Sequence, residues 1–443
     1  MRVAASIEEA RRTFLERAPA SAELPEAMAE VIERVFGQRL SAEEVVRRIV
    51  DEVRRDGDTA VRRFNLAFDG VDAEELEVDT GEMEKARQRL EPSLRGALEF
   101  AAGRIRSYHE EQLAHAARNF FSDGRGQRVT AVERAGIYVP GTAAVYPSSV
   151  LMTAIPAEVA GVGEIIMATP AGSDGCVSPL KLAAAAIAGV DRVFRISGAQ
   201  AIAALAQGTE SVPRVDKIYG PGGLFVTLAK RAVFGQVGID SIYGPSETIV
   251  VIDESADPAL AAADLLAQAE HDELATPILF STSQANLDAT LREVERQVIT
   301  LPREQIARTA LQRQGGALLV KDVEEAIELA NEYAPEHLCL NVIHPDKYVE
   351  LVRNAGAIFV GEVSPEAIGD YTAGPSHVMP TGRAARFSGA LGVHDFLKVT
   401  SVIKLDSAMT KALGEQGAII AHAEGFGGHA AAMERRLHRE SAK

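Results

Sequence analysis

A carboxylate and an imidazole stand side by side in this chain at Glu336-His337, directly after Pro335. The helical pattern before them should end at the proline, and the chain beyond it turns apolar and β-branched, so the pair is expected at a helix-to-strand corner. Consecutive side chains at such a corner point in different directions, which lets an acid and a base address two sides of one substrate. Because an adjacent Glu and His are also common at solvated loop edges, the dipeptide alone leaves both interpretations open.

Four other side chains carry the nitrogen and oxygen donors that zinc accepts. Gln268 and His271 are three residues apart on an expected helix and therefore share one face. Asp370 lies in a Gly-Asp-Tyr run without helical or strand period, and His429 follows a glycine-rich break near the end of the chain. A surface pair is the simpler interpretation of the first two, so the residues alone do not decide for a metal site.

Two segments rich in glycine and proline could bind ligands. One is Gly374-Pro375-Ser376-His377, a loop after the expected strand 357–360, where α/β enzymes often carry function. The other, Gly220-Pro221-Gly222-Gly223, joins an expected strand to an expected helix and exposes backbone N–H groups that could bind a phosphate. The nucleotide patterns G-x-G-x-x-G and G-x-x-x-x-G-K-[ST] are absent. Strand-to-helix corners with glycine are common, so a purely structural turn is the open alternative.

The elements that must hold these residues form two blocks in which strands and helices alternate, over 135–233 and 248–360. Such alternation, with strands bounded by Gly and Pro, indicates βαβ units around parallel sheets. Residues 1 to about 125 are expected to be helical, and so are most of residues 409–439. The predicted fold class is α/β, with two Rossmann-like α/β domains built on parallel sheets and small helical N- and C-terminal pieces.

Bulk properties narrow the class of function. The 443 residues exceed one compact core, and 47% hydrophobic with 25% charged residues is typical of a soluble globular protein. The net charge of −17 argues against nucleic acid or an anionic membrane as partner. No apolar run approaches the roughly 20 residues that span a bilayer, and no secretory signal is recognised, so a cytoplasmic location is expected. Only Cys176 and Cys339 occur, and Leu neighbours predict a buried, inert strand thiol at Cys339.

Taken together, the ordered motifs from about Ile49 to the last helix resemble the histidinol dehydrogenase family. Each motif is modestly specific, but their order extends over more than 300 residues. The matching stretches are Arg134-Ala135-Gly136-Ile137-Tyr138-Val139-Pro140-Gly141, Tyr146-Pro147-Ser148-Ser149-Val150-Leu151-Met152, Gly198-Ala199-Gln200-Ala201-Ile202-Ala203, Gly244-Pro245-Ser246-Glu247, Gln268-Ala269-Glu270-His271, Ala334-Pro335-Glu336-His337-Leu338, Gly369-Asp370-Tyr371 and Glu424-Gly425.

The resemblance implies a zinc- and NAD-dependent oxidation of L-histidinol to L-histidine in two steps, through an enzyme-bound aldehyde. It implies a homodimer in which Glu424 and His429 complete the site of the partner subunit. The expected division of the chain is an N-terminal helical segment (1–25), a first α/β domain (26–130 with 240–381), a second, NAD-binding domain (131–239) and a C-terminal helical piece that crosses to the partner (382–443).

Individual roles follow from the same resemblance. His337 matches the general base, and Glu336 matches the residue that activates water. The zinc ligands would be Gln268, His271, Asp370 and His429, and these four with His337 would also contact substrate. Further substrate contacts are implied for Ser246, His377 and Glu424, and contacts to NAD for Tyr138, Gln200 and the turn at Gly223.

This chain departs from the family pattern at the glycine turn and in the histidine loop. Gly223 and Ser376 each stand where the family usually has Asn. The missing side chain at Gly223 predicts weaker NAD binding. Two alternatives stay open: a related zinc/NAD dehydrogenase that oxidises another primary alcohol, and a non-catalytic relative that binds a metal or an imidazole.

Overall fold

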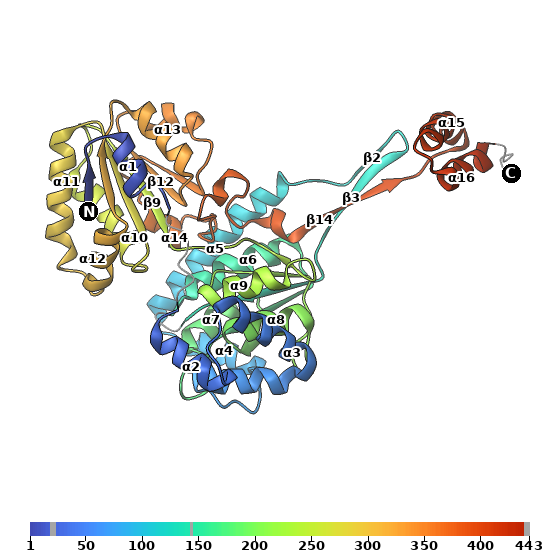
Figure 1. The fold of residues 1–443 in the computed structure, drawn as a ribbon, viewed down its shortest axis with the longest axis horizontal. Helices are drawn as coiled ribbons and strands as arrows, with labels where there is room; N and C mark the ends of the chain where they lie inside the picture. The colour runs from blue at the N-terminus through green and yellow to red at the C-terminus, as the bar shows by residue number, and fades with distance from the viewer. Residues whose placement is uncertain (18–23, 142–144, 438–443) are drawn as a thin grey trace. The chain divides into compact units, whose positions relative to one another are not determined.

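The computed structural model describes residues 1–17, 24–141 and 145–437, which belong to two compact units. The larger unit combines residues 1–114 with 132–396 and contains two parallel sheets (Figure 1). The smaller unit combines residues 115–131 with the chain from residue 397 onward. The chain therefore passes between the units at three points.

The first sheet of the larger unit has six strands in the order β1-β11-β10-β9-β12-β13, and every neighbouring pair is parallel. Since β9 is flanked by β10 on one side and β12 on the other, the chain changes direction across the sheet between β9 and β12. The strands are β1 (Arg2–Ala4), β9 (Glu247–Ile252), β10 (Thr276–Ser281), β11 (Gly316–Leu319), β12 (His337–Asn341) and β13 (Ala357–Val360).

Helices cover both faces of this sheet, because its central strands carry apolar side chains on both sides. One apolar core lies between the sheet and α1 (Ile7–Thr13) and α13 (Val323–Tyr333). A second core lies on the opposite face, against α10 (Pro258–Ala269), α11 (Gln284–Val298) and α12 (Glu304–Arg313). The short α14 (Glu366–Tyr371) follows β13.

The second sheet has five parallel strands in the order β6-β5-β4-β7-β8. Its change of direction falls between β4 and β7, and in open parallel sheets ligands bind at the carboxyl ends of the strands at such a point. The strands are β4 (Arg134–Tyr138), β5 (Glu164–Thr169), β6 (Arg192–Arg195), β7 (Lys217–Tyr219) and β8 (Gly238–Ile239).

Eight helices accompany the second sheet. A large apolar core joins the sheet to α2 (Glu26–Phe36), α3 (Ala42–Phe64), α8 (Gly198–Gln207) and α9 (Leu224–Val233). Among the remaining four, α4 packs on α7, α7 on α6, and α6 on α5. Their bounds are α4 (Thr80–Arg89), α5 (Pro92–Ala114), α6 (Pro147–Ala160) and α7 (Pro179–Ala188).

The α/β class with two parallel sheets is confirmed, but two expectations about the N-terminal half were wrong. Residues 2–4 form strand β1 on the edge of the first sheet, because the exposed edge of β11 offers backbone groups that need partners. Helices α2 and α3 pack on the second sheet although we grouped residues 26–130 with the first, since both contribute to its apolar core and α3 packs against α8 and α9. The remaining domain boundaries stay a prediction.

The smaller unit begins with a three-stranded antiparallel sheet in the order β14-β3-β2, formed by β2 (Phe120–Ser122), β3 (Arg125–Ala131) and β14 (Leu397–Ile403). Two packed helices follow, α15 (Ser407–Ala423) and α16 (Gly427–Leu437). The break between them falls at the predicted glycines, and Gly425 has a φ of 80°, which favours glycine. Residues 382–443 are therefore not purely helical, because β14 pairs with β3 along seven residues.

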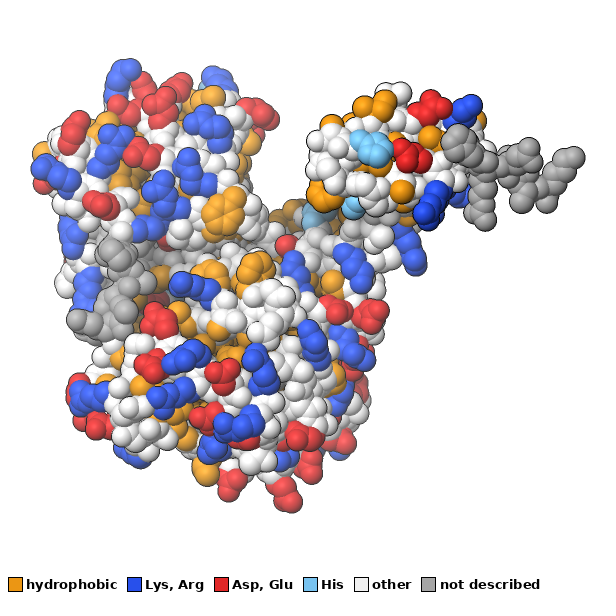
Figure 2. Space-filling model, turned by 45° about the vertical axis from the view of Figure 1, so that its right-hand side comes forward, with side chains coloured by type: hydrophobic (Ala, Val, Ile, Leu, Met, Phe, Trp, Pro, Cys, Tyr) orange, Lys and Arg blue, Asp and Glu red, His pale blue; other side chains and the backbone are white. Residues whose placement is uncertain are grey.

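Among the described residues, no helix is long and apolar enough to cross a membrane. On the face shown in Figure 2, Lys and Arg side chains are interspersed with Asp and Glu, and that face carries no extended area of positive charge.

Candidate active site

The Glu336-His337 pair lies at the predicted corner, between the end of α13 and the start of β12. Helix α13 ends at Tyr333, Ala334 adopts a left-handed conformation with φ 58°, and Pro335 follows. Both side chains of the pair are buried, and His337 Nδ1 lies 3.6 Å from Glu336 Oε2. The pair is thus an enclosed acid/base couple and not a solvated loop edge.

The two ring nitrogens of His337 face different groups. Nδ1 lies 3.3 Å from the Glu247 carbonyl oxygen, so it carries a proton and donates to that oxygen. Nε2 lies 3.5 Å from Gln268 Nε2 and 3.5 Å from Asp370 Oδ1. Nε2, which has a lone pair when the ring is neutral, therefore faces two of the side chains that the sequence suggested as metal ligands.

Burial and neighbouring charges shift the pKa values of the side chains in this cluster. Burial raises the pKa of Glu336 to about 7 and that of Glu366 to about 8. Burial lowers the pKa of His337, but the carboxylates of Glu336, Asp370 and Glu366 outweigh it and raise that pKa overall. Glu336 and Glu366 can therefore hold and release protons near neutral pH, and the neutral form of His337 is a stronger base than a free imidazole.

Three helices end at this site. Gln268 lies in the last turn of α10, with His271 just beyond it, and Asp370 lies in the last turn of α14. Helix C-termini carry partial negative charge, which favours a cation nearby. The Glu336-His337 corner follows the end of α13, so the cluster lies at the amino ends of β9 and β12 and not at their carboxyl ends.

The donor set is compatible with a metal ion but incomplete in this unit. Gln268 Nε2 lies 3.4 Å from Asp370 Oδ2, so the amide and the carboxylate converge. His271 Nδ1 donates to the Ala267 carbonyl oxygen at 2.9 Å, so Nε2 is the nitrogen that could accept a metal ion. Over the described residues, no group of three His, Cys, Asp or Glu side chains could hold a metal by itself. A zinc site here would need the Gln268 amide and a further ligand.

His377 lies in a loop between the two sheets. Its Nδ1 donates to the Asp370 carbonyl oxygen at 2.8 Å, and its Nε2 faces the Ser149 hydroxyl at 3.1 Å. Burial lowers the pKa of His377, so the ring is neutral and Nε2 accepts from Ser149. Ser376 is buried and donates to the Met152 carbonyl oxygen at 3.0 Å. The loop is thereby fastened to α6.

Glu424 and His429 lie in the smaller unit. They line one hollow there, together with Phe426, Ile420 and Met433. Both side chains are exposed, and the rings of Phe426 and His429 lie 5.3 Å apart. The structure therefore places this pair of candidate residues in a different unit from the other candidates.

The candidate cofactor residues gather at the carboxyl edge of the second sheet. Gly220 has φ 106°, and a Cβ there would lie 2.2 Å from the Tyr138 carbonyl oxygen, so only glycine allows the ends of β4 and β7 to approach. The Tyr138 hydroxyl accepts from Gly198 N at 3.2 Å, and Gln200 Nε2 donates to Asn65 at 3.1 Å. Both side chains are buried in the core, and Gly223 is exposed at the start of α9.

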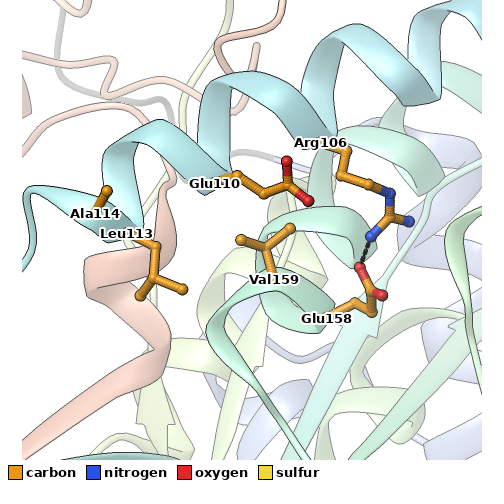
Figure 3. Close-up of a pocket in the computed structure, with 6 residues that line it drawn as sticks. All are labelled: Arg106, Glu110, Leu113, Ala114, Glu158 and Val159. Atoms are coloured by element: carbon orange, nitrogen blue, oxygen red, sulfur yellow. Dashed lines mark hydrogen bonds and ion pairs between the residues drawn. The ribbon is translucent and has the colours of Figure 1, made fainter.

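A further concavity is separate from all these residues. Figure 3 shows it between α5 and α6, with the ion pair of Arg106 and Glu158 at one side. No residue singled out from the sequence lines it, so it is not the candidate active site. Its lining residues are Arg106, Glu110, Leu113, Ala114, Glu158 and Val159.

Comparison with known proteins decides the family. A family model described as histidinol dehydrogenase matches residues 34–437. The chain is 48% identical over 422 residues to histidinol dehydrogenase of Nitrosospira multiformis, which covers 94% of this chain and 96% of that protein. It is 50% identical over 399 residues to that of Nitrosomonas europaea, with 89% and 92% covered. The chain belongs to the histidinol dehydrogenase family.

A solved structure agrees with this assignment. The crystal structure of histidinol dehydrogenase from Elizabethkingia anophelis superposes with a TM-score of 0.88 at 31% identity, covering 98% of this chain and 97% of that one. Members of the histidinol dehydrogenase family are oxidoreductases that convert L-histidinol to L-histidine in two NAD-linked oxidations. The chain is accordingly an enzyme that acts on a small molecule.

Two buried residues of this histidinol dehydrogenase fold were overlooked at the sequence level. Glu247 was quoted in a motif without a role, yet its backbone contacts both Glu336 and His337. Glu366 is fully buried and accepts from Thr248 at 2.9 Å. For Glu247 the available signal was an acid at the start of an apolar strand, since carboxylates are rarely buried without a partner, and Glu366 carried no such signal.

Proposed function

We propose that Glu336 and His337 carry both oxidations, with His337 as general base for the alcohol and Glu336 as the group that activates water for the aldehyde. The observation that carries this proposal is the orientation of the His337 ring. In the neutral ring, with Nδ1–H bound to the Glu247 carbonyl, Nε2 is the nitrogen that takes the hydroxyl proton as hydride leaves the alcohol carbon.

The second oxidation needs a hydrated aldehyde, and Glu336 suits that step. Its raised pKa makes the carboxylate a stronger base than an exposed one. Glu247 N donates to Glu336 Oε2 at 3.1 Å, which fixes one carboxylate oxygen and leaves the other to take a proton from water. His377 holds the Asp370 backbone, while His377, Ser246 and Glu424 are the proposed contacts to the polar groups of L-histidinol.

We further propose that zinc is held by Gln268, His271, Asp370 and His429. Support comes from the convergence of Gln268 and Asp370 at helix C-termini and from the position of His271 just beyond the end of α10, where its Nδ1 is held by the Ala267 carbonyl oxygen. When bound, zinc would orient the substrate by its imidazole and amino nitrogens.

NAD, the hydride acceptor, is proposed to bind at the carboxyl edge of the second sheet. The turn after Gly220 exposes backbone N–H groups before α9, as a pyrophosphate site requires. Tyr138 and Gln200 stay proposed contacts, although both already hold hydrogen bonds inside the core.

A homodimer is proposed because Glu424 and His429 belong to a separate unit that also exposes a set of large apolar side chains. Exposed apolar groups of this kind are typical of an interface. They are Phe120 at 57%, Phe121 at 51%, Ile403 at 76%, Ile419 at 65% and Ile420 at 60% exposure.

Separate assays of the two half-reactions test the catalytic assignment. Glu336→Gln should slow oxidation of histidinaldehyde more than oxidation of histidinol, while His337→Asn should slow the alcohol step most. Two NADH per histidinol is the expected yield of the wild type. Equal losses in both half-reactions for both variants would refute the assignment.

Mixing inactive variants tests the shared site. If His429 serves the partner's site, a heterodimer of His337→Asn and His429→Ala contains one intact site. Random exchange gives about half heterodimers, so about one quarter of wild-type activity should return. No recovery after verified subunit exchange would show that each subunit supplies its own His429.

A further inference from the structure

Arg17 follows α1 near the start of the chain and binds the backbone just before the proposed catalytic pair. Its Nε and Nη2 donate to the two carboxylate oxygens of Glu247 at 2.5 and 2.7 Å. The same guanidinium donates to the carbonyl oxygens of Tyr333 at 2.8 Å and Ala334 at 3.3 Å. It also lies over the Tyr333 ring, 3.7 Å from the ring centre. One side chain thus joins the start of β9 to the end of α13.

The two carbonyls that Arg17 binds are the ones the corner leaves without helical partners. A helix end has carbonyls that lack intrahelical donors, and Pro335 has no N–H to offer. Ala334 adopts a left-handed conformation that costs a residue with a Cβ about 1 kcal/mol or more. A cation at a helix C-terminus is favourable, so Arg17 stabilises this corner where its geometry is least favoured.

The other partner of Arg17 contacts both catalytic residues directly. Glu247 N donates to Glu336 Oε2 at 3.1 Å, and the Glu247 carbonyl oxygen accepts from His337 Nδ1 at 3.3 Å. Gly382 N donates to the Glu247 carboxylate at 3.2 Å. Any displacement of Glu247 against the end of α13 therefore changes the position of both catalytic groups.

We propose that Arg17 is a positioning residue for both oxidations, because it holds Glu247 and the end of α13 in the arrangement that aims Glu336 and His337. This inference rests on the proposed function of that pair. Arg17 does not touch the reacting atoms; it acts through Glu247 and the backbone of the corner. The contact is enclosed, with side-chain exposures of 21% for Arg17 and 7% for Glu247.

A matched control also links the N-terminal segment around α1 to the end of α13. Arg11 on α1 pairs with Glu332 on α13 at 2.7 Å, but these side chains are 50% and 54% exposed and touch neither Glu247 nor the corner. Exposed ion pairs contribute little to stability. Arg11→Met therefore removes a link between the same segments without disturbing the catalytic pair.

Steady-state kinetics with L-histidinol and NAD test the proposal. Arg17→Met should lower kcat about 10- to 100-fold, since small misplacements of catalytic groups have effects of that size, while KM for histidinol changes less than about threefold. Arg17→Lys keeps the charge but loses the planar fork, so its kcat should fall between those of Arg17→Met and the wild type. Arg11→Met should stay within about twofold of the wild type.

Chemical rescue separates positioning from a general structural role. Arg17→Ala leaves space for a free guanidinium ion, which should restore part of kcat at concentrations far below those that unfold the protein, while equal sodium chloride should not. Because Arg17 and Glu247 act through one contact, Arg17→Met and Glu247→Gln together should lose no more than the worse single variant. If Arg17→Met or Arg17→Ala does not fold, Arg17→Lys carries the same test.

The results that overturn the inference differ from those that overturn the proposed function. Wild-type kcat in folded Arg17→Met or Arg17→Lys would remove Arg17 from positioning while leaving His337 as the base. A loss in KM alone, or an equal loss in Arg11→Met, would indicate a general packing role. If the wild type itself fails to oxidise histidinol, or if His337→Asn is fully active, the proposed function fails first.

Discussion

Removal of the buried charge at Lys230 should weaken both the fold and the binding of NAD. Lys230 and Asp240 form an ion pair in which each side chain is 2% exposed. Lys230 Nζ also donates to the Gly220 carbonyl oxygen at 3.0 Å, and Asp240 accepts from Gly220 N at 2.7 Å. The pair therefore holds both backbone groups of the first glycine in the proposed phosphate turn.

The size of the effect follows from what Lys230→Met leaves behind. Breaking a buried ion pair from one side costs about 3–5 kcal/mol, because the other charge stays buried. Asp240 keeps three donors, namely Gly220 N, Ser241 N at 2.7 Å and the Tyr243 hydroxyl at 3.0 Å, which places the loss at the lower end. Burial lowers the pKa of Lys230, so its own desolvation offsets part of the gain. We expect a loss of about 2–3 kcal/mol in the free energy of unfolding.

Two measurements on Lys230→Met check this reasoning. Urea unfolding should give the stated loss, and calorimetric titration should show NAD affinity reduced at least about tenfold, which is 1.4 kcal/mol. Lys217→Met is the control, because Lys217 lies on β7 and donates to the Asp395 carbonyl oxygen at 2.8 Å without touching the turn. Unchanged NAD affinity in a destabilised Lys230→Met would show that the turn is not part of the cofactor site, and unchanged unfolding would refute the stabilising role of the pair.

Three further predictions concern a buried acid, the glycine turn and the metal. Burial raises the pKa of Asp264 to about 6, so its ionisation lowers the stability of the fold as pH rises from about 4 through 6. Asp264→Asn should therefore leave the free energy of unfolding nearly unchanged near pH 4 and raise it by up to about 3 kcal/mol above pH 7. Urea unfolding at both pH values measures this difference. A Cβ at Gly223 meets no atom within 4 Å, so Gly223→Asn should fold and lower KM for NAD; a higher KM in that variant contradicts the expected contact. Removal of zinc with a chelator should abolish histidinol oxidation but leave NAD affinity within about twofold, because the two proposed sites use different sheets. A parallel loss of NAD affinity would argue for one joint site.

Local signals predicted most of the elements. Strands and helices alternate over 135–233 and 248–360 as predicted, and β13 has the bounds of the expected strand 357–360, because proline, glycine and apolar spacing act within a few positions of themselves. The edge strand β1 and the three-stranded sheet of the smaller unit could not be predicted in this way. Their stability depends on partners far along the chain, as when β14 pairs with β3.

The candidate site likewise combines local features, which the sequence predicts, with long-range contacts, which it does not. The corner at Pro335 is a local property, and it was correctly predicted. The contacts that aim the corner are not local, since Arg17 and Glu247 are 230 positions apart. Neither residue lies in a sequence motif that would identify its partner. The sequence could therefore suggest which groups do chemistry, but not which groups hold them.

The electrostatics of helix ends give a physical reason for the proposed division between the two sheets. Gln268, Asp370 and the Glu336 corner lie at or just beyond the C-terminal ends of three helices, where partial negative charge and buried carboxylates favour a cation. The turn at Gly223 lies at the N-terminal end of α9, where N–H groups and partial positive charge favour a phosphate. A metal that must hold an imidazole and a cofactor that carries a pyrophosphate need opposite fields. The first sheet offers the amino ends of its strands and the second sheet the carboxyl ends, so both fields are available within one unit. This explains why the proposed catalytic corner lies at the amino ends of β9 and β12, although ligands of parallel sheets ordinarily bind at the carboxyl ends.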